Sequence, residues 1–325
     1  MSKIFKQVLS VLVKVAISVI LLVVLFRMVG HENIFEVIRS ANKPLLLLAF
    51  LVYSLGYVLC LFRWDMLLRA VDLRLPLSRV VISFSGGIFF NLFLPSTIGG
   101  DLMRSVDLST HTKKPKEVIA TILLDRLSGY IGLVLLALSS LVLGWKLLQE
   151  PSVLFSVAVI TGLLIFILLV LFSKFFYSRI NSLLGAPGAG KIHEMISSLH
   201  HEVHIFRQHK KVIVKNIILS IAVQTIAPLS FYISALALGL KISPVYFFVF
   251  LPVIGAITLL PLSIGGLGLR DATTIFFFAK AGVGKDLAFA MSLINFSFIL
   301  ALGAVGGLIY VLTIRHRRIQ YNKPS

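Results

Sequence analysis

The sequence predicts an all-α integral membrane protein, with about six full transmembrane helices and two re-entrant helical hairpins arranged as an inverted-topology repeat. Three observations predict this class: the composition, the length of the apolar runs, and a motif that occurs twice. Hydrophobic residues make up 58% of the 325 residues and charged residues only 14%, whereas about a quarter of a soluble domain is charged. We therefore expect residues 1–325 to form a single polytopic membrane domain.

Several apolar runs are long enough to cross a bilayer, which takes about 20 residues. They fall near residues 8–29, 45–62, 118–143, 153–173, 212–238 and 286–313. The first run is too long for the core of a signal peptide, so we expect it to remain as an uncleaved span. Two further apolar stretches, 80–94 and 245–260, are shorter, and each runs into a break that contains Pro and Gly.

These two breaks are copies of one motif. The first reads L-P-S-T-I-G-G-D-L-M-R at residues 94–104, and the second reads L-P-L-S-I-G-G-L-G-L-R at residues 260–270. The offset of 166 residues is about half of the chain. Duplicated polar breaks in an apolar chain indicate two related halves around one site, which we place at about 45–143 and 212–313.

The positions of Lys and Arg predict the topology, because these residues favour cytoplasmic loops. With the N-terminus inside, 21 of the 31 Lys and Arg residues fall in predicted inside segments and seven in outside segments. Both flanks of residues 80–100 are then cytoplasmic, so this segment is expected to enter the membrane and return. Residues 245–283 form a second hairpin, which enters from outside. Both termini are cytoplasmic, and the protein is expected in the inner membrane with the inverted repeat of many secondary transporters.

A cytoplasmic segment at about 190–211 has apolar residues at alternating spacings of four and three. This pattern predicts an amphipathic helix on the anionic inner leaflet. Two of its histidines, His200 and His204, are one turn apart and could bind a metal. No carboxylate or Cys completes the set, so we favour solvated surface histidines and predict no metal site and no cofactor.

The glycines of both motifs precede a predicted half-helix, whose N-terminus would offer free N–H groups and the positive end of a dipole. They are Gly99, Gly100, Gly265 and Gly266. Such a helix start binds anions, phosphate included. Asp101 and Asp271 would either cap these half-helices or orient nearby arginines. The alternative is that each motif is only a tight turn between packed helices.

Three arginines are candidate ligands for a lipid phosphate, because the planar guanidinium group suits phosphate. Arg104 and Arg270 end the two motifs, and Arg126 follows Asp125 in the span that begins near residue 118. That position is about 10–12 Å below the surface, where charges are costly and usually functional. The alternatives are that Arg104 is an ordinary loop charge and that Asp125 and Arg126 form a structural lock between hairpin and helix.

Asn91 and Asn295 are secondary candidates. Asn295 occupies in the second half a place comparable to that of Asp125 and Arg126, and an interhelical hydrogen bond would also explain Asn91. The sequence contains no phosphate-binding loop, dinucleotide fingerprint, nucleophile elbow or zinc-protease motif. We therefore name no catalytic residue and expect a protein other than an enzyme.

Two stretches of the chain also resemble a known family. The pattern N-x-x-L-P-S-x-x-G-G-D-x-x-R at 91–104, followed by L-D-R at 124–126, resembles the transmembrane region of the lysylphosphatidylglycerol synthases, a flippase-like family. P-x-x-x-G-G-x-G-x-R-D at 261–271 is similar to its second motif, with Asp271 where the family usually has Glu. The resemblance implies movement of a phospholipid between leaflets. The synthases add a C-terminal cytosolic domain, and because this chain ends at Ser325 we expect a stand-alone member without it.

The function predicted is a lipid translocase that moves a phospholipid or a polyprenyl-phosphate-linked lipid between leaflets of the cytoplasmic membrane. Expected partners are membrane lipids with anionic headgroups and a separately encoded synthase or glycosyltransferase. One alternative is an enzyme that modifies a lipid headgroup by phosphatidylglycerol aminoacyl transfer or polyprenyl-linked glycosyl transfer. Another is a non-catalytic partner of such an enzyme. Nucleic-acid binding is not expected, because the net charge of +18 is divided among short stretches between apolar runs.

Overall fold

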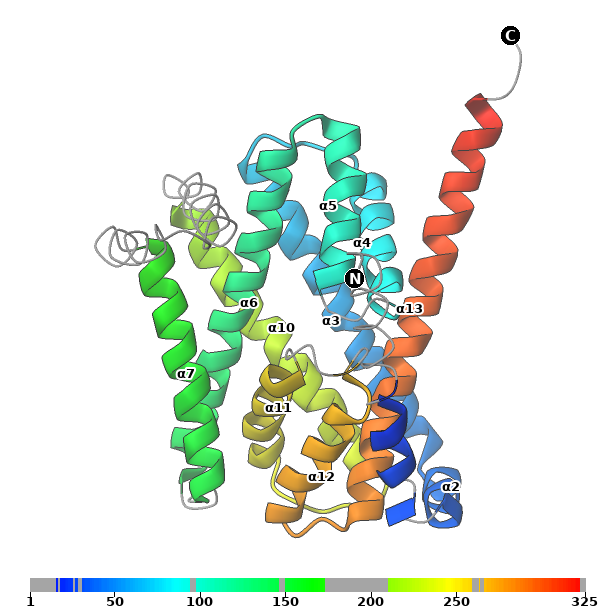
Figure 1. Ribbon diagram of the computed structural model, residues 1–325, viewed down its shortest axis with the longest axis vertical. Coiled ribbons are helices and arrows are strands. Elements are labelled where there is room, and N and C mark those ends of the chain that lie inside the picture. Colours follow the sequence, from blue (N-terminus) through cyan, green and yellow to red (C-terminus); the bar gives the residue numbers. More distant parts are fainter. Residues whose placement is uncertain are drawn as a thin grey trace, which may run out of the picture.

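A computed structural model of the chain is a bundle of α-helices (Figure 1). It describes residues 16, 18–25, 27–28, 31–93, 98–145, 150–172, 210–258, 263 and 266–321. The helices are α2 (His31–Ser40), α3 (Lys43–Ala70), α4 (Leu77–Asn91), α5 (Ile98–Thr112), α6 (Pro115–Leu143), α7 (Pro151–Phe172), α10 (Lys210–Ala237), α11 (Val245–Thr258), α12 (Leu269–Lys280) and α13 (Lys285–Tyr321).

Four of the described helices are long and apolar enough to cross a membrane: α3, α6, α10 and α13. The run predicted at 153–173 forms α7, whose Pro151–Phe166 part counts among the shorter apolar helices. Half of the run at 8–29 lies outside the described residues. The prediction of an all-helical membrane protein is confirmed, and the count of six full spans stays a prediction.

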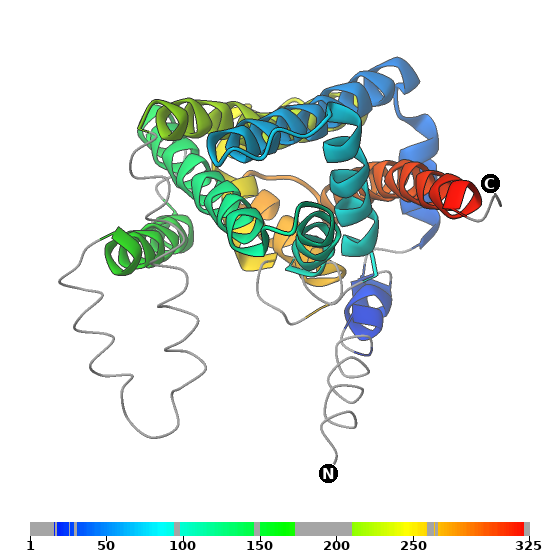
Figure 2. The same ribbon diagram turned by 90° about the horizontal axis from the view of Figure 1, so that it is seen from above.

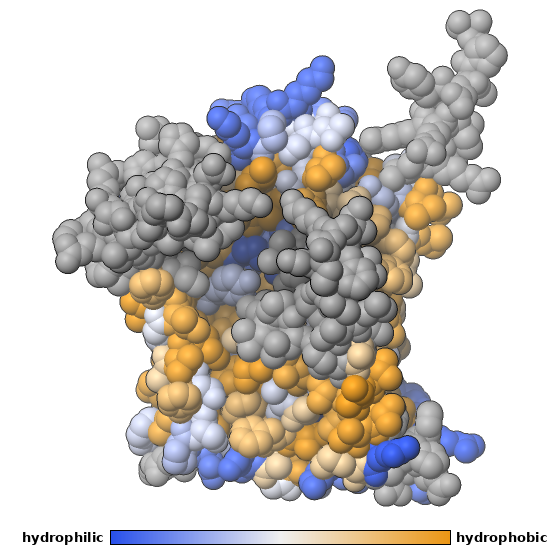
Figure 3. Space-filling view, in the orientation of Figure 1, coloured by the Kyte–Doolittle hydropathy of each residue, from blue (hydrophilic) through white to orange (hydrophobic). Residues whose placement is uncertain are grey.

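The outer surface of α3 shows why a bilayer suits this bundle. Leu47, Leu51, Leu55 and Val58 follow one another at helical spacing, and each exposes about half of its surface. Apolar residues of this kind also dominate the lower part of the face in Figure 3. An apolar patch of this extent is a liability in water, whereas lipid tails cover it without cost.

The helices of the two predicted halves follow the same order of lengths. In each, a long helix is followed by two short ones and then by a long one: α3, α4, α5, α6 and then α10, α11, α12, α13. Figure 1 shows α4 and α5 in the upper half of the bundle and α11 and α12 in the lower half. The short pairs therefore extend from opposite ends toward the middle. That they are re-entrant hairpins of an inverted repeat stays a prediction.

The two halves pack into one another rather than side by side. Helix α10 packs on α3 and α6, and α13 packs on α4; Figure 2 shows α3 and α10 together along one face. The Ser230 hydroxyl donates to the carbonyl oxygen of Ala49 at 2.9 Å. A Cβ on Gly306 would lie 2.8 Å from the carbonyl oxygen of Ser85, so glycine permits the close approach of α13 and α4.

Glycine also shapes the start of α12. Gly266 and Gly268 have φ angles of 75° and 78°, a left-handed conformation that is costly for other residues. The Asp271 carboxylate accepts a hydrogen bond from the Gly268 N–H at 2.9 Å, so it caps the helix. Residues 94–97, 259–262 and 264–265, which belong to or adjoin the two motifs, lie outside the described residues, and so do residues 173–209 with His200, His204 and most of the expected amphipathic helix.

Helix α3 extends beyond the predicted span of 45–62 and ends at Ala70. Trp64, Leu67 and Leu68 are fully buried, so the apolar face that drives the helix continues past Arg63. Arg63, which the prediction places in the cytoplasmic segment 63–79, lies within α3 and is buried; the side of the membrane on which it lies stays a prediction. Arg79 of α4 and Arg104 of α5 are likewise buried in helices, and Arg79 pairs with Asp107 at 2.8 Å.

Candidate functional site

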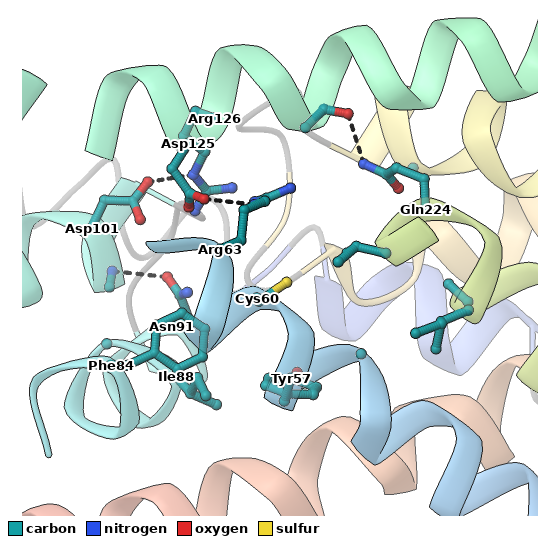
Figure 4. Close-up of a pocket in the computed structure, with 18 of the residues that line it drawn as sticks. Tyr57, Cys60, Arg63, Phe84, Ile88, Asn91, Asp101, Asp125, Arg126 and Gln224 are labelled. Atoms are coloured by element: carbon teal, nitrogen blue, oxygen red, sulfur yellow. Dashed lines mark hydrogen bonds and ion pairs between the residues drawn. The ribbon is translucent and has the colours of Figure 1, made fainter. Parts of the chain in front are cut away.

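A cavity of about 400 Å³ lies inside the bundle (Figure 4). Its walls come from α3, α4, α5, α6 and α10, with Gly255 of α11. Five of the lining residues are charged: Arg63, Asp101, Arg104, Asp125 and Arg126. Charged side chains in the interior of an apolar bundle are costly unless they are paired, so the pairing of these five decides what the cavity can bind.

Asp125 of α6 is the centre of this charged cluster. Its Oδ1 accepts a hydrogen bond from Arg63 Nε at 2.7 Å, and its Oδ2 accepts one from Arg104 Nη2 at 3.2 Å. The three side chains expose only 5–7% of their surface. Arg63 also donates from Nη1 to the Ser220 hydroxyl of α10 at 3.0 Å. One carboxylate therefore ties α6 to α3 and α5, and through Arg63 to α10.

Asp101, in the first turn of α5, extends the cluster to a third arginine. Its Oδ1 accepts from Arg104 Nη2 and Nε at 2.9 and 3.0 Å, and its Oδ2 accepts from Arg126 Nε. Arg126 is the most accessible of the three arginines, with 32% of its side chain exposed. With three arginines and two aspartates, the charged cluster has a formal charge of +1. The charged cluster is therefore net positive, with the partly exposed Arg126 at its edge.

The guanidinium group of Arg104 also contacts two aromatic rings. It lies 4.8 Å from the ring centre of Trp64 and 5.8 Å from that of Phe84, which is the range of cation–π attraction. The indole Nε1 of Trp64 donates to the Thr121 hydroxyl at 3.1 Å, which fixes the ring. Arg104 is therefore a rigid, buried element of the site, and the alternative of a loop charge is wrong.

Asn91 joins α4 to the start of α5. Its Oδ1 accepts a hydrogen bond from the Gly100 N–H at 2.8 Å. The expected free N–H group at Gly100 is thus already used by Asn91 in this conformation. Gly99 lies beside Gly100 in the first turn of α5. A Cβ on Gly100 would overlap the carbonyl oxygen of Gly87, so Gly100 serves the close contact between α4 and α5.

The second motif forms a separate charged group. Asp271, fully buried, accepts at Oδ1 from Arg270 Nη2 at 3.0 Å and from the Ser292 hydroxyl. The Arg270 guanidinium carbon also lies 4.9 Å from the ring centre of Phe296. Asn295 is 3% exposed, and its Nδ2 has no hydrogen-bond partner among the described residues. Gly266 lies just before this group, and Gly265 lies outside the described residues.

The structure thus brings together part of the predicted site. Arg104, Arg126, Asp101, Asp125 and Asn91 line one cavity, whereas Arg270 and Asp271 pair with each other and are not among its lining residues. The third arginine of the charged cluster is Arg63, which was not among the predicted site residues, and not Arg270. A signal for Arg63 was present in the sequence: an arginine next to Trp64 inside a continuing apolar helical pattern. In the part of the chain that the structure describes, no group of three or more His, Cys, Asp or Glu side chains is arranged to hold a metal ion.

Long apolar helices around a buried, positively charged cavity define a multi-pass membrane protein with an internal polar site. The chain belongs to the family of the lysylphosphatidylglycerol synthase transmembrane region, whose model matches residues 11–307. This confirms the resemblance seen in the two motifs.

The chain is similar to several curated membrane proteins. Two proteins of Methanothermobacter thermautotrophicus, both named UPF0104 membrane protein, are 23% and 25% identical to this chain. The alignments cover 86% and 89% of this chain and 86% and 92% of the relatives. A UPF0104 membrane protein of Pyrococcus horikoshii is 23% identical over 50% of this chain and 48% of its own length. These names state membrane location and no activity.

Proposed function

We propose that this protein is a flippase-like lipid translocase and that its cavity receives the phosphate of a lipid headgroup. The observation that carries this proposal is the charged cluster of three arginines and two aspartates inside an apolar bundle. A buried positive charge without a counter-ion is unfavourable. A phosphate diester supplies one negative charge and acceptor oxygens suited to guanidinium groups.

The accessibility of the arginines assigns their roles. Arg126, with a third of its side chain exposed, would contact the phosphate first, and Arg104 and Arg63 would attract it from behind. Asp101 and Asp125 would hold the guanidinium groups in position. Figure 3 shows a hydrophilic patch in a hollow between α6 and α5, with hydrophobic surface below it. An opening of this kind suits a lipid whose headgroup enters the cavity while its tails stay in the bilayer.

The mechanism proposed is alternating exposure of the headgroup site to the two leaflets of the inner membrane. The pairs α4–α5 and α11–α12 would act as re-entrant hairpins that enter from opposite faces, as in transporters built from inverted repeats. Arg270 would then serve as the cation of the second hairpin in a conformation where that hairpin closes on the headgroup. Both termini would be cytoplasmic. A separately encoded synthase or glycosyltransferase would supply the lipid.

Replacement of Arg126 by Gln is expected to reduce lipid translocation at least about tenfold, since a charge-assisted hydrogen bond contributes about 1.5–3 kcal/mol. The full chain is reconstituted in vesicles with phosphatidylglycerol labelled on an acyl chain. Translocation is measured as the label that becomes accessible to a membrane-impermeant quencher. Arg69→Gln is the matched control, because its side chain is 55% exposed and pairs with Asp65 away from the cavity.

Two results would contradict the proposed function. One is a native chain that moves no lipid faster than protein-free vesicles do. The other is unchanged translocation in both Arg126→Gln and Arg270→Gln. Formation of a modified lipid by the purified chain alone would instead support the alternative of a headgroup-modifying enzyme.

A further inference from the structure

We propose that two tyrosines of α3, Tyr53 and Tyr57, and Phe298 of α13 form a closed gate at one end of the cavity. Beyond this gate lies the second charged group, the one around Arg270, and a headgroup passes from the cavity to that group beside Gly255. This inference rests on the proposed function, because it assumes that a lipid headgroup enters the cavity. It goes further in placing the route of the headgroup through the bundle.

The cavity follows one face of α3. Tyr53, Tyr57, Cys60 and Arg63 all line it, at spacings of four, three and three residues. The stretch of helix from Tyr53 to Arg63 is about 15 Å long, whereas the hydrocarbon core of a bilayer is about 30 Å thick. Figure 4 shows Arg63 beside Asp125 and Tyr57 on the side of the cavity away from that carboxylate. The cavity therefore supplies about half of a route across the membrane, with a charged end and a tyrosine end.

The second charged group lies past the tyrosine end. The ring centre of Phe298 is 6.1 Å from that of Tyr53 and 5.4 Å from that of Phe50. Helix α13 thus meets α3 on the side of Tyr53 that points away from Arg63. The same stretch of α13 contacts the Arg270 guanidinium group through a hydroxyl and an aromatic ring, and the charge of Arg270 also acts on Tyr53. The two charged groups are therefore separated by the rings of the gate.

Gly255 of α11 connects the cavity to the second motif. It lines the cavity, and its carbonyl oxygen accepts a hydrogen bond from the Thr258 hydroxyl at 2.7 Å. A Cβ on Gly266 would lie 3.5 Å from the Cβ of Thr258 and 3.9 Å from that of Arg270. Among the described residues, a Cβ on Gly255 would meet no atom beyond its own stretch of helix within 4 Å. The missing side chain thus keeps this end of the cavity wide, as the passage of a headgroup requires.

Aromatic rings suit the role of the gate. The ring centres of Tyr53 and Tyr57 are 5.6 Å apart, and Phe298, which is 8% exposed, packs on the first of them. A hydrophobic constriction stops water and polar groups until its side chains move apart. The tyrosine hydroxyls can then donate hydrogen bonds to a headgroup that passes. In this conformation the cavity is accessible at its charged end, where Arg126 is 32% exposed, and closed toward α12.

The first test narrows the passage. Gly255→Leu is expected to reduce translocation of acyl-labelled phosphatidylglycerol in the vesicle assay at least about tenfold, because an added barrier of about 1.4 kcal/mol already slows a step by that factor. Gly162→Leu is the matched control. It places the same side chain on α7, at another glycine whose Cβ would meet no described atom beyond its own stretch of helix within 4 Å, and it is expected to keep the native rate.

The second test opens the gate. Cys60 is the only cysteine of the chain, and it lines the cavity on the charged side of Tyr57. In vesicles that hold the chain in one orientation, a membrane-impermeant thiol reagent is expected to modify Cys60 at least about tenfold faster from one face than from the other. The double variant Tyr53→Ala/Tyr57→Ala is expected to reduce this difference to within about threefold. Phe62→Ala, which removes a 48% exposed ring from the same helix, is expected to preserve it.

The outcomes separate the inference from the proposed function. Equal translocation by Gly255→Leu and Gly162→Leu would overturn the passage beside Gly255 and leave a lipid translocase standing. Modification of native Cys60 at equal rates from both faces, or from neither face, would overturn the gate, and so would a full difference in the double tyrosine variant. A native chain that translocates no lipid would overturn the proposed function and the inference with it.

Discussion

Asp125→Asn is expected to destabilise the protein by about 3–5 kcal/mol, the range for removal of one partner of a buried ion pair. The substitution keeps the size of the side chain and removes its charge. Arg63 and Arg104, whose side chains are 7% and 5% exposed, would then lose their shared carboxylate. Denaturation of the full chain in detergent, followed by tryptophan fluorescence, measures the effect, since Trp64 lies 4.8 Å from the Arg104 guanidinium carbon.

Asp65→Asn is the matched control for this prediction. It makes the same chemical change in an ion pair whose arginine, Arg69, is 55% exposed, so the expected loss is below about 1 kcal/mol. Adding Arg63→Met to Asp125→Asn should recover part of the stability, because Arg63 then no longer leaves an uncompensated charge, while Arg104 keeps its pair with Asp101. Equal losses in Asp65→Asn and Asp125→Asn would show that the charged cluster does not stabilise the bundle.

Much of the charged cluster was predictable from the sequence, because charged residues are rare within long apolar runs and need partners there. Asp125 and Arg126 lie well inside an apolar run, where a charge needs a partner, and the nearest candidates were Asp101 and Arg104 in the first motif. The structure pairs Arg126 with Asp101 and Asp125 with Arg104. A lipid environment thus restricts the possible partners enough for sequence reasoning to find most of them.

Arg63 and Arg270 show what the sequence could not settle. The predicted span ended at residue 62, so Arg63 was not considered as a site residue, whereas α3 continues to Ala70 and buries both Arg63 and Trp64. The motif duplication suggested that Arg270 would join Arg104. A shared motif predicts a shared local structure, whereas the meeting of two side chains depends on how the halves pack. Here Arg270 contacts Asp271 and Ser292 instead.

Gly100→Ala is expected to destabilise the protein by about 1–3 kcal/mol, the usual cost of overpacking, and to reduce translocation in the vesicle assay. Its Cβ would overlap the carbonyl oxygen of Gly87 and lie 2.6 Å from Asn91 Nδ2. Because backbone atoms cannot rotate away, α4 and α5 must separate. The hydrogen bond from Gly100 to Asn91 weakens, and Asp101, one residue further, moves away from Arg126. The effect therefore reaches the proposed phosphate contact through the backbone.

Gly162→Ala in α7 is the control for this argument. Among the described residues, a Cβ at Gly162 meets no atom beyond its own stretch of helix within 4 Å, and alanine favours an exposed helix by up to about 1 kcal/mol over glycine. The control should therefore be neutral or slightly stabilising and should translocate lipid normally. If Gly100→Ala behaved like Gly162→Ala in both measurements, the close contact of α4 and α5 would not be what aligns Asp101 with Arg126. The glycine pair of the first motif would then be explained as a tight turn between packed helices.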